Sequence, residues 1–319
     1  MSSDSSSRSQ NIPSHTSLQI NLHTPTTTTN DDAKPMPLPP NTTPAPSSIF
    51  ELGMSPATQT EDETPAAPTT SALPKDHPKA EPSSSPSSSS SLSSKEFFRP
   101  KLRVHLEDLA EPGSSVFLGN THAATLFPSA VSRVQKLLYV SPDTPGLHMP
   151  PTRSVTLVVR SLDGVAHTIG KPLDPEHHKE IHLSTGYVAG IASHRRAHEI
   201  EGVLVHELVH CYQWNGKGAA PGGLIEGFAD WVRLRCGLSP PHWHRGDELK
   251  GKWDAGYQNT AYFLEYLEER FGEGTVRRLN EALRTRKYEE KEYWTGVLGR
   301  PVEQLWGDYK EKMEKESKK

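Results

Sequence analysis

Two histidines and a glutamate near the middle of the chain have the spacing of a catalytic metal site. They form the pattern HELVH, in which His206 and His210 are four positions apart. On a helix, residues four apart lie on one face, so both imidazoles can bind a single zinc ion. Glu207, beside the first histidine, is then placed to take a proton from a water at that ion and pass it to a leaving amine. The pattern predicts hydrolytic zinc chemistry.

Two acidic residues follow on what we predict to be a second helix. Glu226 comes sixteen residues after His210, and Asp230 follows one helical turn later. Glu226 is predicted as the third protein ligand, which leaves the fourth zinc position for a water whose pKa the metal lowers. Asp230 is predicted to orient a ligating imidazole; an ordinary surface carboxylate is the alternative.

The residues around these side chains indicate the helices that carry them. Apolar residues recur with helical period over 199–214, and this pattern predicts a buried helix that ends at Gly216. The next helix is predicted from Pro221, which suits a first turn, to about Cys236, before Gly237. The two helices are therefore expected to face each other across the metal.

A sheet is predicted before these helices and more helices after them. A helix over 121–139 separates the first two strands, and Asp163-Gly164 predicts a hairpin between the second and third, followed by a loop over 171–178. The predicted strands are 101–106, 153–161, 165–169 and 179–184. Later helices are predicted over 254–271, 275–283, 289–298 and 302–313. This order predicts an α+β class with an N-terminal twisted sheet and a helical C-terminal part.

Composition divides the 319-residue chain near residue 98. Residues 1–98 are rich in Ser, Thr and Pro and hold five Lys and Arg against ten Asp and Glu, which leaves 30 against 29 for residues 99–319. The first segment cannot bury enough apolar surface to order itself, so a disordered tail is predicted over 1–98 and one folded domain over 99–319. The near-neutral net charge of this domain gives no electrostatic attraction for nucleic acid, so we expect no nucleic acid partner.

Other sequence features bear on compartment and partners. The N-terminus lacks the pattern of a secretory signal, and no apolar run approaches a membrane span, so we expect a soluble, cytoplasmic monomer that acts on a peptide or protein and binds no membrane. Unconventional secretion stays open. The two cysteines, Cys211 and Cys236, are expected to be thiols; a bridge between them is the alternative.

Three stretches of the chain are distinctive: VLVHELVHCYQWNGKGAAPGGLIEGFADWVRLRCGLSPPHW, WDAGYQNTAYFLEYL and RPVEQLWGDYKEK. They resemble the plant basic secretory protein family, a group of gluzincin-type metallopeptidases of plants, fungi and bacteria, and the resemblance covers residues 100–315. It implies a zincin fold, a zinc cofactor and peptidase activity, with His206, His210 and Glu226 as ligands and Glu207 as general base. The near-neutral charge, the absent signal and the long tail depart from the family's name and affect the expected location and role.

Two further features of the predicted domain bear on substrate binding. Tyr257 is predicted to donate a hydrogen bond to the developing oxyanion, with a core tyrosine as the alternative. The strand over 179–184 is predicted as the sheet edge that pairs with an extended substrate. These predictions together describe a zinc metallopeptidase. The alternatives are a zinc-binding fold that recognises peptides or glycans without turnover, and an interaction protein that acts through its tail.

Overall fold

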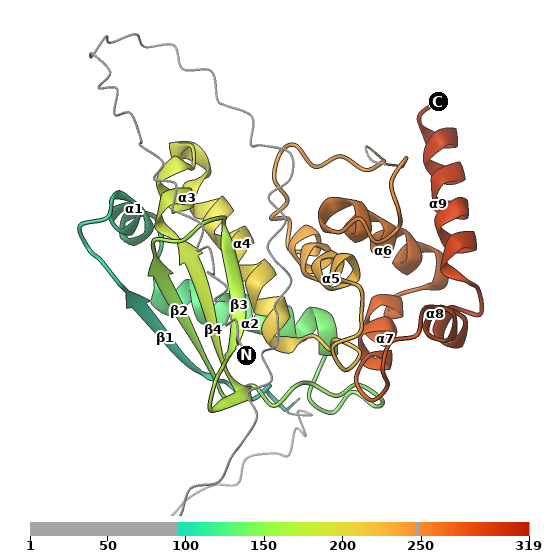
Figure 1. Cartoon of the computed structure of the whole chain (residues 1–319), viewed down its shortest axis with the longest axis horizontal. Helices are drawn as coiled ribbons and strands as arrows, with labels where there is room; N and C mark the ends of the chain where they lie inside the picture. The colour runs from blue at the N-terminus through green and yellow to red at the C-terminus, as the bar shows by residue number, and fades with distance from the viewer. Residues whose placement is uncertain (1–94, 247–248, 319) are drawn as a thin grey trace, which may run out of the picture. The chain divides into compact units, whose positions relative to one another are not determined.

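The computed structural model describes residues 95–246 and 249–318. They form a four-stranded sheet with helices, followed by a helical C-terminal part, so the α+β class is confirmed (Figure 1). The predicted disordered tail lies outside the described residues, apart from residues 95–98. Among the described helices, none is both long enough and apolar enough to cross a membrane.

The sheet has a mixed order in which the last strand of the sequence lies in the interior. Its strands are β1 (Lys101–Leu106), β2 (Ser154–Arg160), β3 (Ala166–Lys171) and β4 (Asp174–Ser184). The spatial order is β1-β2-β4-β3, with β1, β2 and β4 parallel and β3 antiparallel to β4. This order leaves β3 at an edge of the sheet.

The predicted hairpin across Asp163-Gly164 is wrong. The buried strand β2 pairs with β1 and β4, and Gly164, with φ of 86°, turns the chain toward the far edge instead. The hairpin in this region joins β3 to β4 through Pro172 and Leu173, inside the segment predicted as a loop. The polar residues at the start of β4 hid this extension, because they lack the apolar alternation of a half-buried strand.

Two helices connect β1 to β2, and another follows β4. The predicted helix over 121–139 is confirmed as α2 (Ala123–Tyr139), whereas α1 (Pro112–Asn120) and α3 (Thr185–Gly190) were not predicted. The α1 and α3 helices pack closely, since a Cβ on Gly113 would lie 2.0 Å from the carbonyl oxygen of Thr185. A glycine is required at that contact.

The two motif helices and the later helices form where the sequence predicts them. They are α4 (Arg196–Tyr212), α5 (Gly222–Arg235), α6 (Tyr257–Phe271), α7 (Thr275–Ala282), α8 (Glu290–Leu298) and α9 (Val302–Glu316). One apolar core runs through sheet and helices, and it includes alternate residues of β2 and β4, such as Val155, Leu157, Ile181 and Leu183. Both cysteines are free thiols, as expected.

Candidate metal centre

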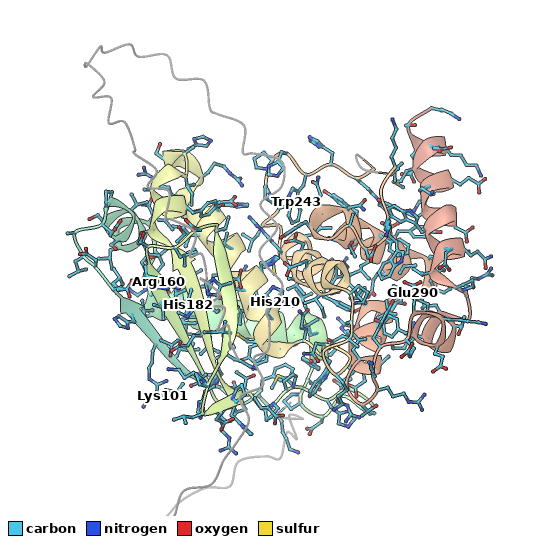
Figure 2. All side chains as sticks on the ribbon, viewed as in Figure 1. Lys101, Arg160, His182, His210, Trp243 and Glu290 are labelled. Atoms are coloured by element: carbon cyan, nitrogen blue, oxygen red, sulfur yellow. The ribbon has the colours of Figure 1, made fainter. Side chains whose placement is uncertain are left out.

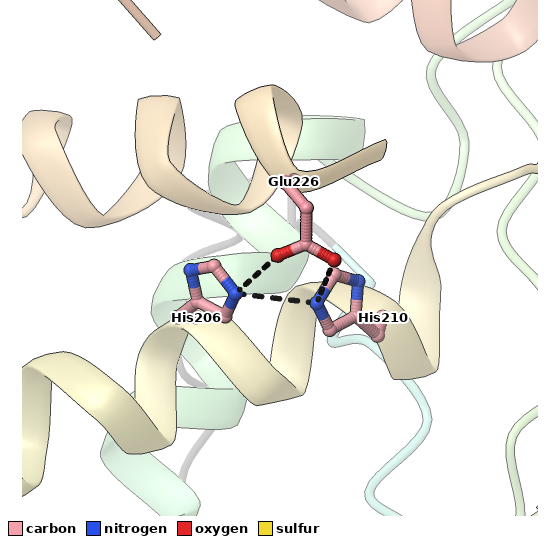
Figure 3. Close-up of side chains that lie close together, drawn as sticks. All are labelled: His206, His210 and Glu226. Carbon is pink, nitrogen blue, oxygen red and sulfur yellow. Dashed lines mark hydrogen bonds and ion pairs between the residues drawn. The ribbon is translucent and has the colours of Figure 1, made fainter. Parts of the chain in front are cut away.

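Helices α4 and α5 bring three predicted site residues to one point (Figure 3). His206 and His210 lie on α4 and Glu226 lies on α5, and one donor atom from each lies within 4.8 Å of the others. Within residues 95–246 and 249–318, no other group of three His, Cys, Asp or Glu side chains is arranged in this way. The sequence spacing therefore predicted a real cluster in space.

The helical periodicity of α4 explains why the histidines face α5. Val205, Leu208 and Val209 lie between and beside the histidines and are fully buried in the core. These apolar contacts fix the rotation of the helix, so that its remaining face carries both imidazoles toward Glu226. Figure 2 labels His210 on this helix, beside the sheet.

The distances within the cluster suit a small cation with tetrahedral coordination. The Nε2 atoms of His206 and His210 are 3.3 Å apart. Glu226 places Oε2 at 3.1 Å from Nε2 of His206 and Oε1 at 3.8 Å from Nε2 of His210. Ligands bound at about 2.0–2.1 Å in a tetrahedral site lie about 3.3 Å from one another. The three side chains can therefore hold one zinc ion with little rearrangement.

Asp230 determines which nitrogen of His206 faces the cluster. Its Oδ1 lies 2.7 Å from Nδ1 of His206, and the side chain is only 1% exposed. A buried carboxylate accepts a hydrogen bond, so Nδ1–H of His206 donates to Asp230 and Nε2 is the nitrogen that faces His210 and Glu226. The structure thus places Asp230 against an imidazole, as predicted, and not on the surface.

The ionisation of these groups follows from burial and from their mutual contacts. Burial disfavours a charged His206, but the Asp230 and Glu226 carboxylates outweigh it and raise its pKa well above 6.5. Burial lowers the pKa of His210, an effect that Glu226 only partly opposes. Burial would raise the pKa of Glu226, yet the hydrogen bond with His206 and the charges of both imidazoles bring it to about 2. Glu226 is an anion at neutral pH.

Gln213 is a contact of the site that the sequence did not reveal. Its side-chain nitrogen lies 2.8 Å from Nδ1 of His210, while its buried Oε1 has no hydrogen-bond partner within the described residues. The two ends of an amide are interchangeable by rotation, and the rotated form lets Oε1 accept from Nδ1–H of His210. The sequence signal was the spacing of three residues after His210.

Thr168 of β3 is a second contact that the sequence did not reveal. Its hydroxyl lies 2.7 Å from Oε2 of Glu207 and 3.0 Å from the backbone oxygen of the same residue. Glu207 itself is only 5% exposed. No sequence spacing connects Thr168 to Glu207, because the contact depends on how β3 packs against α4.

Tyr257 is the first residue of α6 and lies within electrostatic reach of the cluster. It is 37% exposed and has φ of 48°, a conformation that is rare outside glycine. Burial of the phenol and then the carboxylates of Glu226, Asp230 and Glu207 raise its pKa. The phenol therefore stays protonated near the site, and its exposure does not fit the alternative of a core tyrosine.

The prediction that residues 179–184 form the sheet edge is wrong. They belong to β4, which is paired on both sides, and the strand that borders the site is β3. His182 of β4 stacks on His167 with ring centroids 4.9 Å apart and accepts a hydrogen bond from Nε of Arg160 at 2.9 Å (Figure 2). These contacts give His182 a packing role within the sheet.

Comparisons with known proteins support one family. A search of curated proteins and a search of solved structures each gave no match. The family model BSP, described as "Peptidase of plants and bacteria", matches residues 99–309. This range includes every strand of the sheet and all residues of the candidate metal centre. The chain therefore belongs to this family of peptidases of plants and bacteria, as the sequence resemblance predicted.

Proposed function

We propose that the protein is a zinc metallopeptidase of gluzincin type, with a zincin-like domain. The observation that carries this proposal is the convergence of His206, His210 and Glu226, whose donor atoms lie 3.1–3.8 Å apart. Because Asp230 accepts from Nδ1–H of His206, Nε2 is the ring nitrogen that faces Glu226 and His210. Zinc bound there would take the place of the proton on Nε2, and two imidazoles with one carboxylate are a donor set for catalytic zinc.

The chemistry then divides between the metal and the side chains around it. Zinc at this position would supply a Lewis acid that polarises the scissile carbonyl and makes a water acidic near neutral pH. Glu207 follows His206 on α4, about 100° further around the helix, and its carboxylate is close enough to act electrostatically on both imidazoles. It takes the proton of the attacking water and delivers it to the leaving amine.

Tyr257 is proposed to stabilise the oxygen that becomes negative during the attack. Its phenol is protonated at neutral pH, since burial and the site carboxylates raise its pKa. A protonated phenol can donate a hydrogen bond to the oxyanion. The glycine before it, Gly256, packs on the first turn of α5, with the added Cβ only 3.4 Å from Gly223. This contact ties Tyr257 to the helix that carries Glu226.

The edge strand β3 is proposed to bind an extended peptide substrate. The amide of Ser184 donates to the carbonyl of Val165 at 2.9 Å, so this antiparallel pair is a hydrogen-bonded one. Bonded and non-bonded pairs alternate along the ladder, so Ala166 and Thr168 direct their backbone N–H and C=O groups away from β4. These groups can pair with a peptide of any side-chain sequence, because the contacts are made by backbone atoms.

Substitution of Glu207 tests the proposal directly. We expect Glu207→Gln to fold, to retain zinc, and to cleave casein with a kcat at least about 100-fold lower, because the amide cannot take the proton. Glu201→Gln, on the same helix but outside the site, serves as the matched control and should cleave like wild type. Equal rates for Glu207→Gln and wild type would reject the mechanism. A zinc-loaded wild type that cleaves no peptide library would instead favour a binding role.

A further inference from the structure

We infer that Thr168 is a positioning residue that holds Glu207 and links it to the substrate-binding edge of the sheet. This inference rests on the proposed peptidase function. Thr168 lies on β3, and its hydroxyl is 2.7 Å from Oε2 of Glu207 and 3.0 Å from the Glu207 carbonyl oxygen. This hydrogen bond reaches the proposed general base from outside its own helix.

The direction of the hydrogen bond follows from the groups involved. The Thr168 hydroxyl has one proton to donate, and Oε2 of Glu207 at 2.7 Å is nearer than the backbone carbonyl oxygen at 3.0 Å, so Oε2 is the main acceptor. This hydrogen bond makes Oε2 the less basic oxygen, so Oε1 of Glu207 is the one that we expect to receive a proton from water. Thr168 thus selects the orientation of the base.

Thr168 also belongs to the proposed contact with the substrate. The residue faces α4 with its side chain, while the alternation of the β3–β4 ladder turns its backbone N–H and C=O toward the open edge. The one irregularity of this ladder lies between Gly170 and Lys171, beyond Thr168. A peptide paired with β3 would therefore be bound by the same residue that orients the base, which fixes the carbonyl relative to Glu207.

Kinetics of matched variants can separate positioning from a merely structural role. Thr168→Val keeps the shape and the backbone but removes the hydroxyl. We expect kcat to fall on the order of 10-fold, within the loss of roughly 100-fold that a misplacement of 1 Å can cause, with KM and zinc content unchanged. Thr168→Ser retains the hydroxyl and should restore most of kcat.

Thr156→Val is the control for removal of a threonine hydroxyl from a buried strand. Oγ1 of Thr156, on β2, is buried and has no hydrogen-bond partner within the part of the chain that the structure describes. This variant should keep the kcat of wild type. If Thr168→Val turns over as fast as wild type, or if Thr168→Ser is as slow as Thr168→Val, the inference is overturned.

Crystal structures of the zinc-loaded variants decide the inference even if the wild type cleaves no substrate. That result would refute the proposed function alone. A Glu207 carboxylate that changes rotamer in Thr168→Val and returns in Thr168→Ser would support the positioning role. A Glu207 carboxylate that keeps its place in Thr168→Val would overturn it.

Discussion

At the scale of single residues, the hydrogen-bond partners of the two histidines explain why Nε2 of each ring faces Glu226. Asp230 accepts from Nδ1 of His206, and Gln213 lies 2.8 Å from Nδ1 of His210. Each contact leaves an Nε2 atom directed at Glu226. Such outer partners fix the tautomer and the orientation of a ligating imidazole and increase its basicity.

The role of Gln213 leads to a prediction for metal affinity. Gln213→Met fills a similar volume without an acceptor, so it should weaken zinc binding about 10-fold to 100-fold. Gln213→Glu keeps an acceptor oxygen at the same reach and should bind zinc nearly as tightly as wild type. Competition with a chromophoric chelator measures both constants. Zinc affinity of Gln213→Met equal to that of wild type would show that the amide does not support His210.

The sequence predicted those site residues whose relation is set by a helix. His206, Glu207 and His210 follow from one helical turn, and Glu226 with Asp230 from the next helix. Thr168 escaped prediction because its contact with Glu207 is made between a strand and a helix 39 residues apart. Periodicity within one element carries no information about such a pairing.

At the scale of elements, the position of Glu226 depends on how closely α5 approaches α6. A Cβ on Gly223 would lie 1.8 Å from the backbone oxygen of Asp254, and one on Gly227 would lie 2.3 Å from a methyl carbon of Thr260. Both glycines flank Glu226 on α5. The close approach of α5 to α6 and to the segment just before α6 therefore requires small residues at this face.

Adding one methyl group at this contact should disturb the site. Gly223→Ala forces α5 away from a backbone atom, so we expect a loss of about 2 kcal/mol in the free energy of unfolding and weaker zinc binding. Gly222→Ala is the matched control, since a Cβ there meets nothing within 4 Å. Urea unfolding and zinc titration measure the two effects. Equal stability of the two alanine variants would contradict this account of the packing.

A buried ion-pair network holds α4 and α5 together near the start of α4, away from the candidate metal centre. Glu199 of α4 accepts from Arg233 of α5 at 2.7 Å, from Tyr187 at 2.9 Å and from Arg195 at 3.1 Å. Burial raises the pKa of Glu199, but the charge of Arg233 and these hydrogen bonds outweigh it, so the pKa lies below 4.5. A lowered carboxyl pKa stabilises the folded state at higher pH, and that stability is lost as the pH falls through the lowered value.

Removing the charge of Glu199 should destabilise the protein in a pH-dependent way. At pH 7, Glu199→Gln leaves the nearly buried Arg233 without an anionic partner, which should cost about 3 kcal/mol. As the pH falls below 4.5, Glu199 of the wild type takes up a proton and the stability from its ion pair is lost. The free energies of unfolding of the wild type and Glu199→Gln should therefore converge. Glu311→Gln, which breaks an exposed pair with Lys315, should stay within about 1 kcal/mol of wild type. A constant difference between wild type and Glu199→Gln at all pH values would contradict the linkage.

Helices and strands were predicted correctly where the sequence pattern within the segment itself decides its structure. The strand 101–106 and the helices from α4 to α9 follow from alternation, periodicity and turn residues within each segment. The pairing of β3 was mispredicted because Asp163-Gly164 is a local turn signal, whereas strand order is decided by which neighbours bury β2. A buried parallel strand needs partners on both sides, and β4 supplies the second one.

At the scale of the whole molecule, the described residues share one apolar core that supports the site. It contains residues of β2 and β4 as well as the aromatic side chains of the C-terminal helices, among them Phe263, Trp294, Trp306 and Tyr309. The family match over residues 99–309 covers nearly the same part of the chain. The sheet, the two motif helices and the C-terminal helices therefore act together to position a few polar atoms.

Metal analysis of the purified wild type beside Glu226→Ala tests whether His206, His210 and Glu226 bind zinc. Glu226 is the proposed ligand on α5, and its carboxylate oxygens lie 3.1 Å from Nε2 of His206 and 3.8 Å from Nε2 of His210. We expect stoichiometric zinc in the wild type, and loss of both zinc and casein cleavage in Glu226→Ala, while circular dichroism shows a folded protein. Stoichiometric zinc retained in folded Glu226→Ala would rule out Glu226 as a ligand of the site.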